Sequence, residues 1–425
     1  MFFASLGLNA ITPTMPLYLS ERFGLEGADL ERWTGLAFAA APFAAAFCGP
    51  FWGALGDRVG RKLMAVRAIF GIAAISLLLP FARSPLEFVL LRGVQGLLSG
   101  YMAPALSLVS VSVPAGLQSQ VVGRLHSGFA VGLLSGPVAG AQIAAMLGRE
   151  SVFWFTAVMA TIGFGSILVF AREDRERLNV GGGQGLRLFG SLVGFLRRPV
   201  VGPLLATLAL LRFGQQLVDP FLPLWFEEIG LLDFLPSLPV GPPAAEAGAS
   251  GADASTAAIL AVQALGLMLF ASRWGRLGEK FGPLRVLAVA TVVQAVAMGL
   301  SSLFPTPAAF FVVRVLYAIA LAATFTLGLS AVARRVEPES RSLAFGCVQS
   351  CFHAGMFCGP VVGGLAAASV SLRGLFVLSC VTLLFASIAM VLVRRRGMDL
   401  TRASTSQSGT RASDVSSDPS AGNRP

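Results

Sequence analysis

The stretch Gly53–Arg67, G-A-L-G-D-R-V-G-R-K-L-M-A-V-R, packs charged side chains into a short gap between two long apolar runs. Glycines at Gly53, Gly56 and Gly60 allow the chain to turn tightly and let the flanking helices approach. Basic residues alone would indicate only a topological anchor. Because glycines and an acid stand at fixed positions among them, the stretch favours a charged hinge between two membrane spans, as a rocking transporter needs.

The composition predicts an all-α polytopic membrane protein. The 425 residues are 55% hydrophobic and 13% charged, whereas a soluble chain carries about 25% charge. Apolar runs of about 20 residues recur along the chain, which is the length of a membrane-spanning helix. The net charge of +10 comes from arginines in short loops, which is a topology signal and argues against a nucleic-acid partner.

Twelve membrane spans are expected, with boundaries good to a few residues. They are 2–20, 34–55, 63–82, 86–112, 120–147, 151–171, 200–226, 254–272, 284–304, 307–332, 341–369 and 373–393. Basic residues concentrate in alternate loops, so both termini are expected on the cytoplasmic side. The short loops and the Ala/Gly/Arg-rich composition favour a bacterial inner membrane.

The domain organisation follows from composition shifts between the spans. Residues 1–171 form a first six-helix half, and the charged, glycine-containing segment 172–199 is expected to be a cytoplasmic linker. Residues 200–396 form a second half, in which 234–253 is a flexible periplasmic insertion rich in Pro, Ala and Gly. The Ser/Arg/Asp-rich segment 397–425 is expected to be a disordered cytoplasmic tail.

The two halves repeat each other in sequence. The matching pairs are Trp52-Gly53 with Trp274-Gly275, Arg92 with Arg314, Gly136-Pro137 with Gly359-Pro360, and Pro13-x-x-Pro16-Leu17 with Pro220-x-x-Pro223-Leu224. The first three keep one offset within a residue, and the insertion between spans 7 and 8 accounts for the shorter offset of the fourth. Parallel halves of this kind place a substrate site near the bilayer midplane.

The motif Gly53-x-Leu55-x-Asp57-Arg58-x-Gly60-Arg61-Lys62 resembles the signature loop between spans 2 and 3 of the major facilitator superfamily. The resemblance extends over nearly the whole chain. It implies two pseudo-symmetric halves of six helices that alternate access by rocking, with the loop as a conformational switch.

Span 4 carries an arginine within its apolar run. Arg92, Gln95 and Ser99 form one polar stripe on a helix face, and an arginine in hydrocarbon is costly unless it faces a partner or a cavity. The Arg-x-x-Gln-Gly pattern resembles a superfamily motif associated with proton transfer. The alternative is an arginine that reaches the outer interface by snorkelling.

Span 5 contains a glycine ladder with a proline, at Gly128, Gly132, Gly136, Pro137 and Gly140. Glycines four apart make a groove for close helix contact, and the proline bends the helix. The pattern resembles the motif that marks antiporters within the superfamily. Span 11 repeats it around Gly359-Pro360.

Span 7 holds the clearest deep carboxylate, Asp219, on the same helix face as Arg212. Burial and a nearby arginine act on its protonation in opposite senses, which makes it tunable. We hypothesise that Asp219 faces Arg92 or Arg314 and exchanges this salt bridge for a proton. The alternative is a structural pair with Arg212. The superfamily's antiporters often carry an acid in span 1, whereas this chain has none there, and Thr12 occupies the position that matches Asp219.

The resemblance is closest to the twelve-span drug:proton antiporter branch. It implies export of amphipathic small molecules, cations among them, against inward proton flow. The alternatives are an exporter of a specific metabolite or sugar derivative, or a proton symporter.

A membrane enzyme would need a nucleophile set, a metal cluster or a cofactor motif. The sequence contains none, so no cofactor and no metal are expected. A scaffold or receptor would not need charges in spans 4, 7 and 10. The expected partners are lipid, protons and a small-molecule substrate. The protein is expected to be a monomer.

Overall fold

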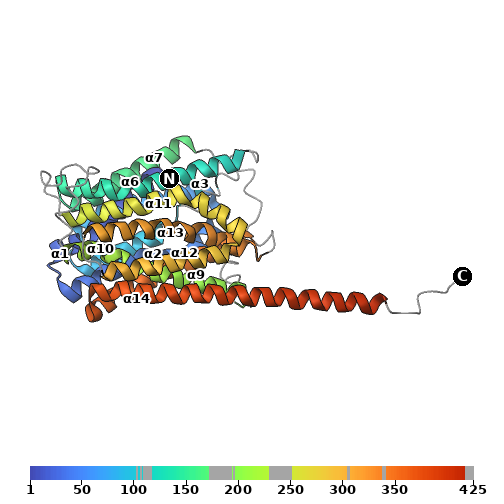
Figure 1. Cartoon of the computed structure of the whole chain (residues 1–425). Helices are drawn as coiled ribbons and strands as arrows, with labels where there is room; N and C mark the ends of the chain where they lie inside the picture. Colours follow the sequence, from blue (N-terminus) through green and yellow to red (C-terminus); the bar gives the residue numbers. More distant parts are fainter. Residues whose placement is uncertain are drawn as a thin grey trace.

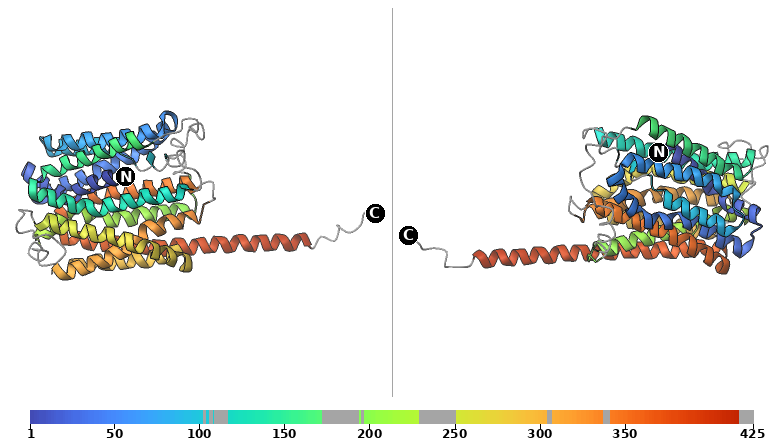
Figure 2. Two further views of the ribbon diagram at one scale, coloured as in Figure 1. Left: turned by 90° about the horizontal axis from the view of Figure 1, so that it is seen from above. Right: turned by 180° about the vertical axis from the view of Figure 1, so that it is seen from behind.

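The computed structural model describes residues 1–101, 104–105, 108, 117–171, 194, 197–228, 251–303, 307–336 and 341–416. Within these ranges the chain is helical and contains no strand. The helices run side by side in a single bundle, and one long helix leaves it toward the C-terminus (Figure 1). Two further views show the same near-parallel packing (Figure 2).

The first half of the bundle, called here the N-terminal half, contains six long helices in its described residues. These are α1 (Phe2–Phe23), α2 (Gly27–Val59), α3 (Arg61–Leu78), α4 (Pro85–Leu98), α6 (Gln118–Leu147) and α7 (Glu150–Phe170), with the short 3₁₀ helix η1 (Leu79–Phe81) after α3. They correspond to the six expected spans. The expected linker 172–199 lies mostly outside the described residues.

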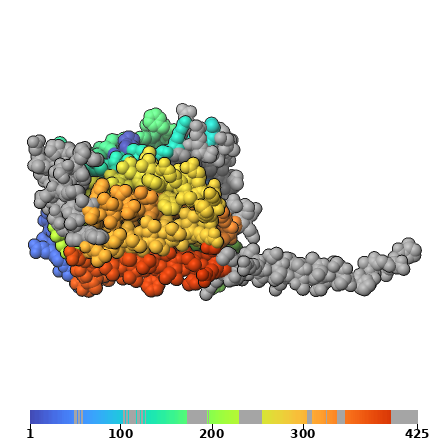
Figure 3. All heavy atoms as spheres, viewed as in Figure 1, coloured from blue at the N-terminus to red at the C-terminus, as the bar shows by residue number. Residues whose placement is uncertain are grey.

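The second half, the C-terminal half, begins with a broken helix. It contains α9 (Val201–Gln216), the 3₁₀ helix η4 (Asp219–Phe221), α10 (Leu222–Glu228), α11 (Gly251–Phe281), α12 (Pro283–Leu303), α13 (Pro307–Ala333) and α14 (Arg341–Ser416). The expected insertion 234–253 lies outside the described residues up to the start of α11. Helices α11 to α14 cover the face shown in Figure 3.

Helix α14 differs from expectation in two ways. It covers both the eleventh and the twelfth span, which join at a kink where Ser371 has a φ of 68°. It also continues to Ser416, where a tail without regular structure was expected from residue 397. After Pro360 the next proline is Pro419, so no residue before that point lacks the backbone N–H that a helix needs. The division into domains stays a prediction.

The bundle has the surface of a protein that meets lipid. Eight helices in the described ranges are long and apolar enough to cross a membrane. Large apolar side chains such as Phe70, Phe81 and Val169 are more than half exposed on the outside. Exposed apolar area of this extent would drive a soluble protein to associate, whereas a bilayer accommodates it.

Helix packing repeats residue by residue between the halves. In the N-terminal half α6 lies on α1, where a Cβ added to Gly132 would come within 2.7 Å of the Cβ of Ser5. In the C-terminal half α14 lies on α9, and a Cβ at Gly355 would come within 2.7 Å of the Cβ of Arg212. Only glycine permits backbones to approach this closely. Both glycine ladders therefore serve the same contact.

Side-chain hydrogen bonds repeat in the same register. The indole of Trp52 donates to the carbonyl oxygen of Leu97 at 2.7 Å, and that of Trp274 donates to the carbonyl oxygen of Ile319 at 2.7 Å. The hydroxyl of Thr156 likewise donates to the carbonyl of Gly7, as Ser379 does to Gly214. The duplication inferred from sequence thus extends to individual contacts.

The halves meet through α2 with α14 and through α6 with α11. A Cβ at Gly364 in α14 would lie 2.6 Å from the carbonyl oxygen of Glu31 in α2. Further along the same two helices, the rings of Phe43 and Phe357 lie 4.6 Å apart. At both positions the two halves are in direct contact in this conformation.

Candidate functional site

The site is built on the break in the helix that forms the seventh span. Helix α9 ends at Gln216, η4 covers Asp219–Phe221, and α10 starts at Leu222. Pro220 lacks an N–H and cannot continue a regular ladder of hydrogen bonds. The short helix η4 packs against α1 and α2 of the other half. Asp219 is therefore at a discontinuity that lies between the halves, where transporters place binding residues.

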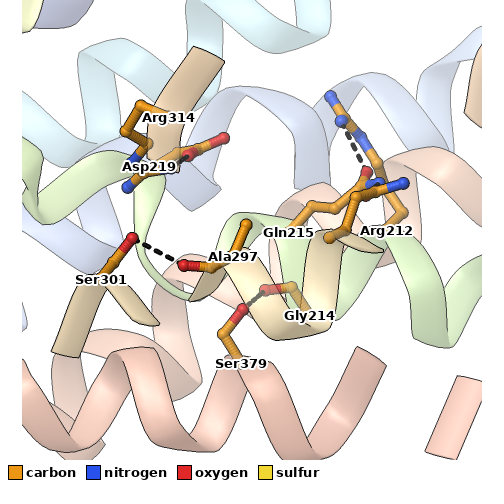
Figure 4. Close-up of polar contacts among 9 residues, drawn as sticks. Arg212, Gly214, Gln215, Asp219, Ala297, Ser301, Arg314 and Ser379 are labelled. Atoms are coloured by element: carbon orange, nitrogen blue, oxygen red, sulfur yellow. Dashed lines mark hydrogen bonds and ion pairs between the residues drawn. The ribbon is translucent and has the colours of Figure 1, made fainter. Parts of the chain in front are cut away.

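Asp219 pairs with Arg314 of α13. The carboxylate oxygen Oδ1 lies 3.7 Å from Nη1 of Arg314, and the two side chains are 17% and 1% exposed. The guanidinium also lies 5.2 to 5.6 Å from the ring centres of Phe310, Tyr317 and Phe376. Figure 4 shows the Asp219–Arg314 pair and, apart from it, Arg212 directed at Gln215. Of the sequence-derived alternatives, the structure pairs Asp219 with Arg314.

Arg212 belongs to a buried polar network. Its guanidinium donates to Oε1 of Gln215 at 3.2 Å. The amide of Gln215 then donates to Gln294 of α12 at 2.7 Å and to Thr324 of α13 at 2.9 Å. Sequence reasoning missed Gln294 and Thr324, because an uncharged polar residue within an apolar run does not by itself indicate a site. Arg212 also interacts electrostatically with Asp219, so the network and the ion pair are neighbours.

Arg92 hydrogen-bonds to neutral groups, whereas Arg314 pairs with a carboxylate. It donates to Oε1 of Gln95 at 2.5 Å and to the carbonyl oxygen of Ala37 in α2 at 3.4 Å. Gln95 in turn donates to the hydroxyl of Ser76 at 3.0 Å. Arg92 and Gln95, which were predicted to share one helix face, are thus in direct contact. Ser99 lies just past the end of α4 and donates to its own helix at Gly96.

The connection between α2 and α3 is shorter than expected. Helix α2 continues to Val59 and α3 starts at Arg61, so the connection is Gly60 alone, with a φ of 115°. That backbone conformation favours glycine. Lys62 donates to the carbonyl of Leu168 in α7 at 3.0 Å. The backbone of Gly53, Asp57 and Arg58 lies in α2, and the side chains of Asp57 and Arg58 are outside the described residues.

The guanidinium of Arg67, in α3, stacks on Trp52. Its Cζ lies 3.4 Å from the centre of the indole ring, and Nη2 reaches the carbonyl oxygen of Ser99 at 3.5 Å. The charged stretch is thereby joined to the end of α4, the helix that carries Arg92. This connects the hinge to one of the candidate site residues.

The glycine ladder of α6 is mostly a packing surface. Cβ atoms at Gly136 and Gly132 would come within 2.8 Å of α1, and Gly140 approaches the backbone of Ala10 even more closely. Gly128 differs, because the nearest atom to an added Cβ would be 3.7 Å away. Pro137 lies inside α6. Among the described residues no group of three or more His, Cys, Asp or Glu side chains is arranged to hold a metal.

The chain resembles known transporters in sequence. The model of the Major Facilitator Superfamily matches residues 1–245 and again 233–419. The multidrug resistance protein MdtG of Citrobacter koseri is 29% identical over 399 residues, which cover 91% of each chain. MdtG of Salmonella arizonae shows the same identity and coverage.

Solved structures share the fold. The crystal structure of the nucleoside transporter NupG aligns with a TM-score of 0.71 at 15% identity, over 92% of this chain and 96% of that one. A bacterial homologue of the human lysosomal transporter Spinster, in an inward-facing and occupied conformation, gives a TM-score of 0.71 at 18% identity, over 92% and 95%. The repeated halves, the membrane helices and these matches together show that the chain is a multi-pass membrane protein of the major facilitator superfamily, a family of transporters rather than enzymes.

Proposed function

We propose that the protein exports small, drug-like amphipathic molecules by proton antiport with alternating access. The observation that carries this proposal is the Asp219–Arg314 ion pair at the break in the seventh span. The relatives named as multidrug resistance proteins support the efflux direction and the breadth of substrates. The antiporter-like glycine ladder, which packs α6 on α1, supports exchange rather than symport.

Asp219 is the proposed proton carrier. As a carboxylate it neutralises part of the charge on Arg314; as a carboxylic acid it leaves that guanidinium without its partner. Breaking a buried pair by removing one charge costs about 3–5 kcal/mol. A change of this size is enough to bias two arrangements of the halves that differ by a few kcal/mol. Because η4 packs against α1 and α2, the protonation state acts at the interface between the halves.

The hinge at Gly60 and the stretch around it are the proposed switch. Helices α2 and α3 are joined there by a single residue, so a small rotation about Gly60 reorients one helix against the other. In the proposed topology this end of the bundle faces the cytoplasm of a bacterial cell, both termini are cytoplasmic, and the protein works as a monomer in the inner membrane.

The test is proton flux in inverted membrane vesicles that contain the wild type or Asp219→Asn. A pH-sensitive dye reports whether added lipophilic compounds dissipate a preformed gradient. We expect wild type to respond to several compounds, Asp219→Asn to respond to none, and Asp219→Glu to retain a response. Proton-driven flux that persists in Asp219→Asn removes Asp219 from the coupling path. If a panel of drug-like compounds, sugars and metabolites gives a response to one metabolite only, a specific metabolite transporter replaces the drug exporter.

A further inference from the structure

We propose that the cluster around Arg314 binds an oxyanion group of the transported molecule, a carboxylate, sulfonate or phosphate on an apolar body. This assignment rests on the proposed function only in so far as the chain carries small organic molecules. It narrows the substrate class to amphipathic anions, which differs from the cations expected from the resemblance to drug:proton antiporters.

In the described part of the chain, the arginines at the centre of the bundle outnumber the carboxylates, and Arg314 shares its carboxylate with Arg212. Within the described residues, Arg212 and Arg314 lie around one carboxylate, Asp219. In the N-terminal half, Arg92 contacts the neutral groups of Gln95 and Ala37. An excess of positive charge in a membrane interior is costly unless a counter-ion enters. A bound anion supplies the missing charge.

Hydrogen-bond donors at the cluster also lack acceptors. The Arg314 side chain is 1% exposed, yet none of its three nitrogens has a hydrogen-bond partner among the described residues, since the Asp219 oxygen at 3.7 Å is too far. Tyr317 Oη and Trp225 Nε1 are likewise buried without partners among the described residues, and so is one acceptor beside Arg314, Oδ1 of Asp219. Buried polar groups are normally satisfied. An oxyanion presents two or three acceptors to a planar guanidinium and matches this set.

Aromatic rings around the same guanidinium suit the apolar part of such a molecule. Phe310, Tyr317 and Phe376 surround Arg314, and Trp225 lies 5.2 Å from Phe376. A pocket with apolar walls and a few convergent polar groups is typical of a small-molecule site. In this conformation the Arg314 side chain is 1% exposed, so entry of an anion requires the surrounding side chains or helices to move.

Protonation of Asp219 should change the affinity of the cluster for ions in a direction that can be measured. When Asp219 takes a proton, the cluster gains one positive charge, so an anion binds more tightly at low pH and a cation binds less tightly. Anion and proton binding therefore reinforce each other at this cluster. Antiport through Asp219 requires the proton and the substrate to weaken each other's binding. A rise in anion affinity at low pH therefore supports the anion site and argues against Asp219 as the antiport carrier for anions, and the pH dependence of binding measures this directly.

The experiment compares three probes with one pyrene body. They are 4-(1-pyrenyl)butyrate, its methyl ester, and 4-(1-pyrenyl)butyltrimethylammonium, and binding to the full-length protein in lipid nanodiscs is measured by equilibrium dialysis. We expect the butyrate to bind about tenfold or more tightly than the ester, as a charge-assisted hydrogen bond predicts. The trimethylammonium probe is expected to bind least tightly. The affinity for butyrate is expected to rise as the pH falls.

Substitutions test whether butyrate binding depends on Arg314. Arg314→Gln is expected to reduce butyrate affinity to that of the ester. Arg83→Gln is the matched control, because Arg83 is exposed and lies between η1 and α4 in the other half; it is expected to change affinity by less than about twofold. Asp219→Asn is expected to tighten butyrate binding and to remove its pH dependence, which misfolding could not imitate.

The inference is overturned if the cationic probe binds as tightly as butyrate, if butyrate does not bind, or if Arg314→Gln leaves its affinity unchanged. Should Arg314→Gln not fold, a failure of Asp219→Asn to tighten butyrate binding overturns it as well. Binding and flux separate the two proposals. Flux of cationic or neutral compounds without anion preference refutes only the anion site. Butyrate binding in a protein that moves no compound supports the site and refutes the transport function.

Discussion

The two halves of the bundle have the same packing and different chemistry. On α1, Ser5, Asn9 and Thr12 occupy the places that Arg212, Gln216 and Asp219 occupy on α9 and η4. The Ser5 hydroxyl donates to the carbonyl of Phe129, a neutral helix-to-helix bond. Duplication has therefore preserved the close helix contacts, while ionic groups are concentrated in the C-terminal half. A symmetric scaffold can thus carry an asymmetric site.

Backbone continuity differs in the same place. Helix α1 runs unbroken through Pro13 and Pro16. The matching prolines, Pro220 and Pro223, coincide with the transition from α9 through η4 to α10. The same proline spacing is therefore compatible with a continuous helix and with a broken one. The break occurs in the half that holds Asp219.

The largest difference is expected between the two matched positions Thr12 and Asp219. Asp219→Asn should reduce proton-driven export to background, because it removes an ionisable group from the centre of the bundle. Thr12→Val should change export by less than about twofold, since it loses only a hydroxyl. Transport in vesicles at equal protein levels measures both. Equal losses in the two variants would mean that position on the scaffold, rather than charge, decides the effect.

Steric substitutions should affect both halves alike. Gly136→Leu and Gly359→Leu should each destabilise the protein by about 3 kcal/mol or more, because their Cβ atoms would meet Asn9 and Gln216 within 2.8 Å. Gly128→Ala is the control, with no atom nearer than 3.7 Å. The midpoint of denaturant-induced unfolding in detergent gives the comparison. A stable Gly359→Leu protein beside an unstable Gly136→Leu protein would break the packing symmetry.

The polar networks of the two halves can be compared through Gln215 and Gln95. Gln215→Leu should cost about 2–3 kcal/mol, because it leaves Arg212, Gln294 and Thr324 with fewer partners. Gln95→Leu should cost about 1–2 kcal/mol, since it affects Arg92 and a single hydroxyl. Unfolding free energies in detergent test the order. A larger cost for Gln95→Leu would place the main polar network in the N-terminal half.

The smallest effects are expected at the matched tryptophans. Trp52→Phe and Trp274→Phe each lose one hydrogen bond to a carbonyl, worth about 1 kcal/mol. Trp52 also stacks with Arg67, whereas Val289 takes the place of that arginine in the second half. Trp52→Phe should therefore be slightly less stable than Trp274→Phe in thermal unfolding. The reverse order would show that the Arg67 contact does not stabilise the folded protein.

Much of the fold could be read from local patterns. Apolar runs predicted where the helices lie, because a bilayer requires long apolar segments with internally satisfied backbones. The offsets between Trp52 and Trp274, and between Gly136 and Gly359, predicted the duplication that the contacts repeat. At the tail, composition predicts disorder from residue 397, whereas α14 continues to Ser416, and the assignment of this segment stays a prediction. Helix continuity there depends on backbone hydrogen bonds, which polar residues also permit.

Within the site, sequence alone determined which ionisable residues lie in apolar runs, namely Arg92, Arg212, Asp219 and Arg314. The sequence allowed three arginines as partners for Asp219, because spacing along one helix does not determine which residues of another helix lie beside it. Only the tertiary structure chose Arg314 and assembled Gln215, Gln294 and Thr324 from three helices. The physical reason is that such groups find partners across helices, and those distances are set by how closely glycine-lined faces allow the helices to pack.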